Sequence, residues 1–190
     1  HIDHCGRIPK LVKDGFRGKI YCTSATRDLS AIMLLDSAKI QESDAEYEAR
    51  KFKKPQKPLY TQIDAKNCLK HFVCTEYDNW FSVNDSIEVL FSDAGHILGS
   101  ATVALKIKEN GKETVLGFSG DIGRYNRPIL NDPAPMPALD YFICESTYGG
   151  KTHEETPESD EHFLKIIYDT CVSKGGKLII PAFSIGRTQE

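Results

Sequence analysis

The chain has 190 residues, which suffices for one domain or for one domain and part of a second. Its hydrophobic share of 40% can fill a buried core, and its net charge of -3 excludes a surface that attracts polyanions along its whole extent. A nucleic-acid partner would therefore require a local concentration of positive charge.

Two composition features concern the cellular environment of the chain. No stretch is long and apolar enough to cross a membrane, and none has the pattern of a signal peptide. The six cysteines form no Cys-x-x-Cys pair, and several lie in apolar runs such as 142–144. We therefore expect a cytoplasmic protein with no membrane partner, whose cysteines are buried free thiols rather than a disulfide framework.

The first six residues, His1-Ile2-Asp3-His4-Cys5-Gly6, concentrate side chains that can bind a metal. In an extended backbone His1 and Asp3 point to the same side, and His4 then stands at the turn into a short helix over 7–13. The alternative is a frayed terminus or the remnant of a tag. A tag would contain histidine alone, so Asp3 and the following Cys-Gly favour a cluster of ligands.

Residues 19–71 are predicted to form a short strand and two helices. The strand covers 19–23, and Thr26 can cap a long helix that runs from Arg27 toward Lys53. The basic, proline-broken stretch 51–58 is either a solvated surface or a contact for phosphate groups. Thr61 and Asp64 can then form a capping box for a helix that ends near His71.

The pattern changes to strands after residue 72. Apolar alternation predicts strands over 87–91, 101–108 and 113–118, and the Asn-Gly pair within 109–112 predicts a hairpin turn between the last two. His96 stands between two glycines on the loop that joins the first two strands. It is either a turn histidine without a role, or a metal ligand or acid–base group.

Two further strands end in carboxylates. Asp121 follows the strand 113–118, and Glu145 follows a strand over 140–144. Beyond them, a helix capped by Thr156 is expected to run to about Lys174, followed by a buried strand over 177–180 and the opening of another helix near the end of the sequence. Because the chain starts within a ligand cluster and stops at a helix opening, we expect a fragment of a longer protein.

The loops at the strand ends together present metal-ligand side chains, namely His1, Asp3, His4, His96, Asp121 and Glu145. Histidine nitrogen and carboxylate oxygen suit zinc, and also manganese or iron. A catalytic zinc usually takes three protein ligands, so this set is too large for one ion. It suits two metals about 3.5–4 Å apart with a bridging carboxylate, an arrangement that hydrolyses phosphodiesters.

Five segments in a fixed order carry a family resemblance: His-x-Asp-His-x-Gly, Asp-Ala-Gly-His-Ile-Leu-Gly-Ser, Ser-Gly-Asp-Ile-Gly-Arg, Glu-Ser-Thr-Tyr-Gly-Gly and Pro-Ala-Phe-Ser-Ile-Gly-Arg-Thr-Gln-Glu. The first three resemble the metallo-β-lactamase superfamily. The last two resemble its β-CASP branch, the RNA-processing nucleases similar to the endonuclease subunit of the cleavage and polyadenylation factor and its prokaryotic relatives. The resemblance covers nearly the whole chain.

This resemblance implies a fold and an activity. The fold would be α/β, with an incomplete four-layer αββα metallo-β-lactamase sandwich over 1–149 and the truncated start of a β-CASP insertion domain over 150–190. The activity would be metal-dependent hydrolysis of single-stranded RNA, endonucleolytic, exonucleolytic or both, by hydroxide attack on phosphorus that leaves a 5′-phosphate. The resemblance also admits a homodimer of the full-length protein.

The resemblance further assigns roles to the site residues. His1 and His96 would hold one metal, Asp3 and His4 the other, and Asp121 would bridge them. Each ion would take one more histidine from outside this sequence, upstream of His1 or beyond Glu190. We therefore expect two zinc ions, or manganese, in the full protein, but partial or no occupancy and no activity in this fragment.

Four residues are expected to have substrate or catalytic roles. Besides binding metal, Asp3 is a catalytic residue, and Glu145 is expected to orient a later histidine that protonates the leaving oxygen. Tyr148 and Arg187 are candidate contacts for phosphate or base, although Arg187 could equally pair with a carboxylate. His153 and His162 match no family ligand and are expected at the surface.

Two other functions fit part of the pattern. A catalytically inactive scaffold subunit of an RNA-processing complex would usually have lost metal ligands, which this chain keeps. A thioester or β-lactam hydrolase of the same superfamily would lack the motifs from Glu145 onward. The retained ligands and the later motifs favour the ribonuclease.

Overall fold

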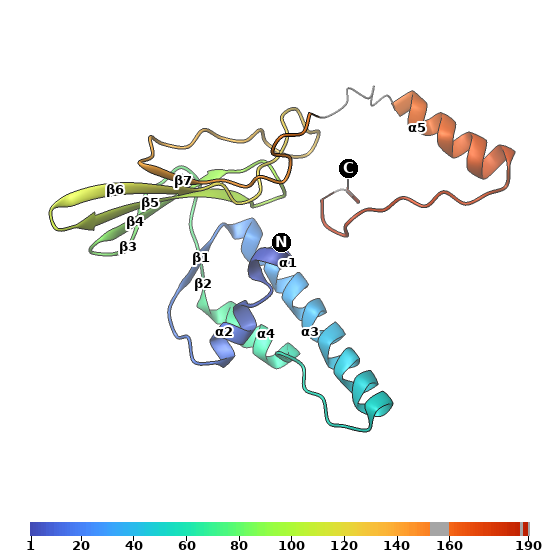
Figure 1. Ribbon diagram of the computed structural model, residues 1–190, viewed down its shortest axis with the longest axis horizontal. Helices are drawn as coiled ribbons and strands as arrows, with labels where there is room; N and C mark the ends of the chain where they lie inside the picture. The colour runs from blue at the N-terminus through green and yellow to red at the C-terminus, as the bar shows by residue number, and fades with distance from the viewer. Residues whose placement is uncertain (153–159, 187, 190) are drawn as a thin grey trace. The chain divides into compact units, whose positions relative to one another are not determined.

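The computed structural model describes residues 1–152, 160–186, 188 and 189 (Figure 1). It divides into two compact units, His1–Glu145 and Ser146–Glu190. No helix of the described residues is long and apolar enough to span a membrane. All the side chains brought together in the candidate site described below belong to the first unit.

The first unit begins with a helical layer. Its helices are α1 (Ile2–Cys5), α2 (Ile8–Lys13), α3 (Ser24–Phe52) and α4 (Gln62–Cys68), the last continued by a 3-10 turn (Leu69–His71). The predicted capping box of α4 is present, with the Thr61 and Asp64 side chains each accepting a backbone N–H of the other residue. The expected cap of α3 is wrong by one turn: Thr23 caps this helix, because its extended backbone lets its hydroxyl accept the N–H of Thr26.

A hydrophobic core holds the helical layer together. It consists of buried residues from α1, α2, α3 and α4 and from the loop before α4, namely Cys5, Val12, Leu34, Ala38, Tyr60, Ala65 and Cys68. Tyr60 is fully buried, and its hydroxyl donates to Ser37 Oγ at 3.0 Å, so its polar end is satisfied. α4 therefore packs against both α2 and α3, as Figure 1 shows.

Two sheets complete the first unit. β1 (Ile20–Cys22) and β2 (Phe72–Cys74) form a parallel pair. A five-stranded sheet has the order β3 (Phe81–Asn84), β4 (Ile87–Asp93), β5 (Ala101–Glu109), β6 (Lys112–Phe118) and β7 (Tyr141–Ile143). The predicted strands and the Asn110-Gly111 hairpin turn are confirmed.

The sheet topology brings distant residues to one edge. Neighbouring strands are antiparallel from β3 to β6, whereas β6 and β7 are parallel. β4, β6 and β7 therefore run in the same direction and end at the same edge. The loops that follow them carry His96, Asp121 and Glu145, which explains how residues far apart in sequence reach one place.

The second unit contains α5 (Asp160–Ile167) and a π-helical turn (Tyr168–Ser173). The expected Thr156 cap, His153 and Arg187 lie outside the described residues. The predicted buried strand over 177–180 is wrong: the segment pairs with no strand of the described chain, and Ile179 is 87% exposed. The described residues around 184–189 form turns rather than the start of a helix.

The six cysteines are free, as predicted. Three of them are buried and three are exposed, respectively Cys5, Cys22, Cys68 and Cys74, Cys144, Cys171. The expected burial of Cys144 is wrong, because it follows β7, a strand at the sheet edge whose three residues are all exposed.

Candidate metal centre

The segment that carries His1 and His4 is helical, so the expectation of an extended backbone is wrong. His1 is the N-cap of α1, and its carbonyl accepts the N–H groups of His4 and Cys5 at 3.1 and 3.2 Å. Helical spacing places residues three apart on one face, and the rings of His1 and His4 lie 4.5 Å apart between centroids. Asp3 is displaced from this face, and its side chain is 80% exposed.

The loop after β4 holds His96 through its own hydrogen bonds. Ser100 Oγ accepts the N–H groups of His96 and Ile97 at 3.1 and 3.2 Å. Asp93 at the end of β4 accepts the N–H of Gly95 at 2.8 Å with one carboxylate oxygen, and the side-chain amide of Asn131 at 3.1 Å with the other. These contacts close the loop on itself, so the His96 backbone has a defined position.

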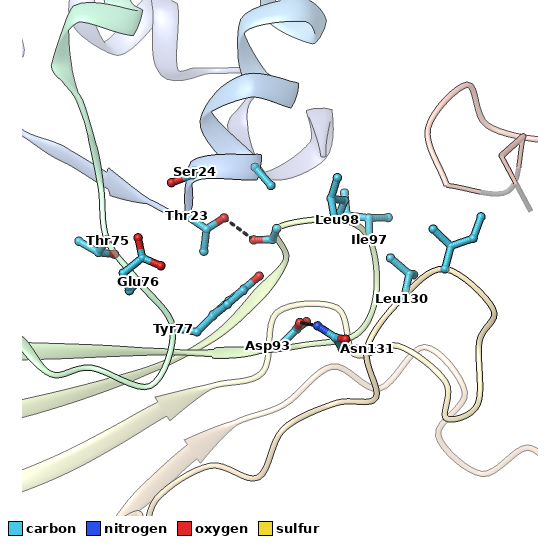
Figure 2. Close-up of a pocket in the computed structure, with 13 residues that line it drawn as sticks. Thr23, Ser24, Thr75, Glu76, Tyr77, Asp93, Ile97, Leu98, Leu130 and Asn131 are labelled. Atoms are coloured by element: carbon cyan, nitrogen blue, oxygen red, sulfur yellow. Dashed lines mark hydrogen bonds between the residues drawn. The ribbon is translucent and has the colours of Figure 1, made fainter.

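Two threonines dock the same loop onto the start of α3. The hydroxyls of Thr23 and Thr26 both donate to the Gly99 carbonyl at 2.8 Å. Gly99 has φ +84°, and a Cβ there would lie 2.6 Å from the Thr26 nitrogen, so the close approach requires glycine. Figure 2 shows Thr23 directed at the loop that carries Ile97 and Leu98.

Tyr77 supports the loop from a second side. Its hydroxyl donates to the Ser100 carbonyl at 2.8 Å. Burial, together with the nearby Asp93 carboxylate, raises the pKa of Tyr77 to about 12. The phenol therefore stays protonated at neutral pH and remains a donor.

Asp121 follows β6 on a loop that is fixed against both neighbouring loops. The Gly123 N–H donates to the Ala94 carbonyl at 2.8 Å, and a Cβ on Gly123 would lie 1.7 Å from the Gly95 oxygen. On the other side, Glu145 Oε1 accepts the N–H of Ile122 at 2.7 Å. The Glu145 N–H in turn donates to Ser119 Oγ at 2.9 Å.

The Asp121 carboxylate is the meeting point of three histidines. Its Oδ2 lies 2.6 Å from His1 Nε2 and 3.7 Å from His96 Nε2, and its Oδ1 lies 3.5 Å from His4 Nε2. One ligand atom from each of His1, His96 and Asp121 lies within 4.8 Å of the other two. All three residues are partly exposed, so an ion and a substrate can reach them.

This donor set fits a metal ion. Two imidazole nitrogens and a carboxylate oxygen are the ligands that zinc prefers in catalytic sites, and they also suit manganese or iron. A cavity of about 370 Å³, lined among others by His1, His4, His96 and Asp121, opens beside the cluster. The site therefore has both the ligands for a metal and room for a further group.

The structure brings together four of the predicted site residues and separates others. His1, His4, His96 and Asp121 converge, and Glu145 holds the Asp121 loop. Asp3 lies at 3.7 Å from His1 Nδ1 but is mostly in solvent. Tyr148 belongs to the second unit and is 58% exposed.

Sequence reasoning missed the residues that hold the loops. The hydrogen bonds of Thr23, Tyr77, Asp93 and Ser100 fix the backbone beside His96. Figure 2 shows Thr23, Tyr77 and Asp93 around the loop that carries Ile97 and Leu98. Asp93 and Ser100 flank the Ala-Gly-His-Ile-Leu-Gly segment. A short polar residue on each side of this glycine-containing loop is the sequence signal that could have identified them as residues that hold the loop. No comparable signal in the sequence marked Tyr77.

Fold and site together define an α/β protein with a histidine–carboxylate centre suited to a metal ion. No family model matches the chain. It is 35% identical over 190 residues to Ribonuclease TTHA0252 of Thermus thermophilus, covering all of this chain and 39% of that protein. It is 37% and 35% identical over 194 residues to transcription termination factor FttA of Methanococcus maripaludis and of Methanocaldococcus jannaschii, covering all of this chain and 28% of each relative.

The chain belongs to the metallo-β-lactamase superfamily, within its β-CASP branch. Its α/β architecture with mixed sheets is compatible with part of the metallo-β-lactamase fold. The chain spans less than half the length of the relatives that it matches.

Proposed function

We propose that the protein is a metal-dependent ribonuclease that hydrolyses phosphodiester bonds of single-stranded RNA. The observation that carries this proposal is the convergence of His1, His4 and His96, from two separate segments, on the Asp121 carboxylate of a third. The printed names of the relatives, a ribonuclease and transcription termination factors, support an RNA substrate. The activity is proposed for the whole protein, of which this chain supplies part of the site.

The centre is proposed to hold two zinc ions, with manganese as the alternative. The support is the division of the Asp121 carboxylate, whose Oδ2 faces His1 and His96 while Oδ1 faces His4. A carboxylate that presents one oxygen to each side is suited to bridge two ions. Asp3 would join His4 after a side-chain rotation, which its exposure permits.

When bound, the metals supply positive charge that activates water and stabilises the negative charge developing on the phosphodiester. The chain's own residues set the geometry. Asp121 is held by the contacts of Gly123 and Glu145 on either side of its loop, and the His96 backbone by Ser100. Glu145 thus acts as a positioning residue, and it is also proposed to orient a histidine that protonates the leaving oxygen.

The domain division is proposed as a metallo-β-lactamase four-layer sandwich over 1–149 and the start of a β-CASP insertion over 150–190. The boundary between the compact units, after Glu145, falls close to this division and supports it. Tyr148 and Arg187 would then lie in or next to the part that contacts RNA. A homodimer of the full-length protein remains part of the same proposal.

The proposal is tested with end-labelled single-stranded RNA and the full-length protein, with and without zinc or manganese. Asp121→Ala should lower the cleavage rate on the order of 10³-fold or more, which corresponds to ~4 kcal/mol of barrier. Asp85→Ala is the matched control, because Asp85 is an exposed carboxylate in the turn between β3 and β4. The size ladder of the products separates endonucleolytic from exonucleolytic cleavage.

Absence of cleavage by a folded, metal-loaded protein would contradict the proposal. It would favour a scaffold subunit without catalysis, or a hydrolase of the same superfamily that acts on another substrate. Equal cleavage by the wild type and Asp121→Ala would also contradict it, because the reaction would then not depend on this centre.

A further inference from the structure

Two cysteines face each other across the parallel strand pair. In the register of β1 and β2, Cys22 is the direct partner of Cys74. Neighbouring strands lie about 4.7–4.9 Å apart, and disulfides span Cα separations of about 4.4–6.8 Å. Paired positions of adjacent strands also present their side chains on the same face of the sheet, so the backbone already has a geometry that a disulfide can bridge.

The two thiols have different surroundings. Cys22 is 7% exposed, whereas Cys74 is exposed to solvent, and both are free. Burial, together with the neighbouring Cys74 thiol, raises the pKa of Cys22 to about 12. Cys22 is therefore shielded from oxidants in solution, and a reagent that attacks this pair must react first at Cys74.

We propose that Cys22 and Cys74 form a reversible disulfide, with Cys74 as the entry point and Cys22 as the resolving thiol. The oxidant is a low-molecular-weight disulfide such as oxidised glutathione. This site is independent of the proposed nuclease activity, because it requires neither a bound metal nor an RNA substrate.

The reaction proceeds by two thiol–disulfide exchanges. Cys74 loses its proton to solvent, attacks one sulfur of oxidised glutathione, and releases one glutathione thiolate, which takes up a proton. Cys22 then loses its proton and attacks the Cys74 sulfur of the mixed disulfide, which releases the second glutathione. In sum, two protein thiols are oxidised to one disulfide, and one oxidised glutathione is reduced to two thiols.

The position of the pair gives the modification a structural context. Cys22 lines the cavity beside the metal centre. It directly precedes Thr23, which caps α3 and donates to the Gly99 carbonyl in the loop that carries His96. The Cys22 carbonyl also accepts the N–H of Thr75, so the two strands stay joined directly beyond the thiols.

Peptide mapping of the full-length protein tests the proposal. The folded protein is treated with oxidised glutathione, free thiols are alkylated, and the protein is digested with trypsin without reductant. Cleavage after lysine and arginine isolates Cys22 in the peptide 20–27 and Cys74 in the peptide 71–106, each as its single cysteine. We expect these two peptides to be linked, with a loss of two thiols that dithiothreitol reverses.

Two variants identify the order of the steps. In Cys22→Ser, the peptide 71–106 should accumulate with glutathione attached, because the resolving thiol is missing. In Cys74→Ser, the peptide 20–27 should stay reduced in the folded protein. The proposal is overturned if wild-type Cys74 carries glutathione while Cys22 stays reduced, if both stay reduced, or if Cys74 is linked instead to an exposed cysteine such as Cys144.

Discussion

The two sides of the candidate metal centre are held in different ways. His96 and Asp121 stand on loops that are tied to each other and to α3 by backbone and side-chain hydrogen bonds. His1 is the N-cap of a helix of four residues and His4 belongs to that helix, and the His4 side chain is 54% exposed. The sheet edge thus provides a preorganised half, whereas the histidine segment is held mainly by its contacts with Asp121 and α3.

The comparison predicts unequal effects for the two sides of the centre. His96→Ala removes a ligand from the preorganised half, and we expect zinc affinity of the full-length protein to fall at least about 100-fold, since changes in supporting residues alone cost 10–100-fold. His4→Ala should lower the affinity for the more tightly bound ion much less, because His4 faces Asp121 Oδ1 and not the Oδ2 that faces His96. Zinc titration of both variants measures the difference.

His71→Ala is the control for these titrations, because His71 bonds to the Gly18 carbonyl outside the site. Equal losses for His4→Ala and His96→Ala would show that both halves bind one shared ion. The division of the centre around the two Asp121 oxygens would then be wrong.

A second prediction addresses the packing between the loops. Gly123→Ala places a methyl group where only 1.7 Å separates it from the Gly95 oxygen, so the His96 and Asp121 loops must move apart. We expect a loss of about 1–3 kcal/mol in unfolding free energy, typical of overpacking, together with weaker zinc binding. Urea denaturation and zinc titration measure the two effects.

Gly111→Ala is the matched control for the loop packing. Gly111 has φ +74° in the β5–β6 turn, with nothing within 4 Å of a new Cβ. This variant should lose stability through backbone strain, on the order of 1 kcal/mol, and retain zinc binding. If Gly123→Ala also retained zinc binding, contact between the loops would not be what preorganises the centre.

The smallest effect is expected far from the site, at the α4 cap. Hydrogen bonding from the Thr61 N–H, reinforced by Lys13, holds the pKa of Asp64 below its ordinary value of 3.8. The stabilisation is therefore present above pH 3.8 and is lost as the pH falls through the lower, folded-state pKa. Asp64→Asn should lower stability near neutral pH by about 1 kcal/mol and make melting less sensitive to acid.

Thermal melting between pH 7 and pH 2 measures this effect, with Asp85→Asn as an exposed control. Zinc affinity at pH 7 should not change in Asp64→Asn. If acid lowered the melting temperatures of the wild type and of Asp64→Asn by the same amount, the role of the cap would be contradicted.

The sequence predicted the sheet and the residues that converge on its edge, for physical reasons that are local. Apolar alternation and the Asn110-Gly111 turn specify β4, β5 and β6, and glycines mark the sharp loops beside His96 and Asp121. That His96, Asp121 and Glu145 reach one edge follows from the common direction of β4, β6 and β7, which only the structure shows.

The failures occurred where contacts distant in sequence decide the conformation. Two threonines, Thr23 and Thr26, can each cap α3, and the choice depends on the docking of both onto Gly99. The helix α1 contacts α3, and its four residues carry no periodicity that could reveal it. The apolar run 177–180 has the composition of a strand, but no described strand pairs with it.

The most direct test of the metal centre is anomalous diffraction at the zinc edge, from crystals of the full-length protein soaked in zinc. The account predicts a peak at coordination distance, about 2.0–2.2 Å, from ligand atoms of His1, His96 and Asp121. A strong peak at another site, with these three side chains ordered and no peak between them, would contradict it.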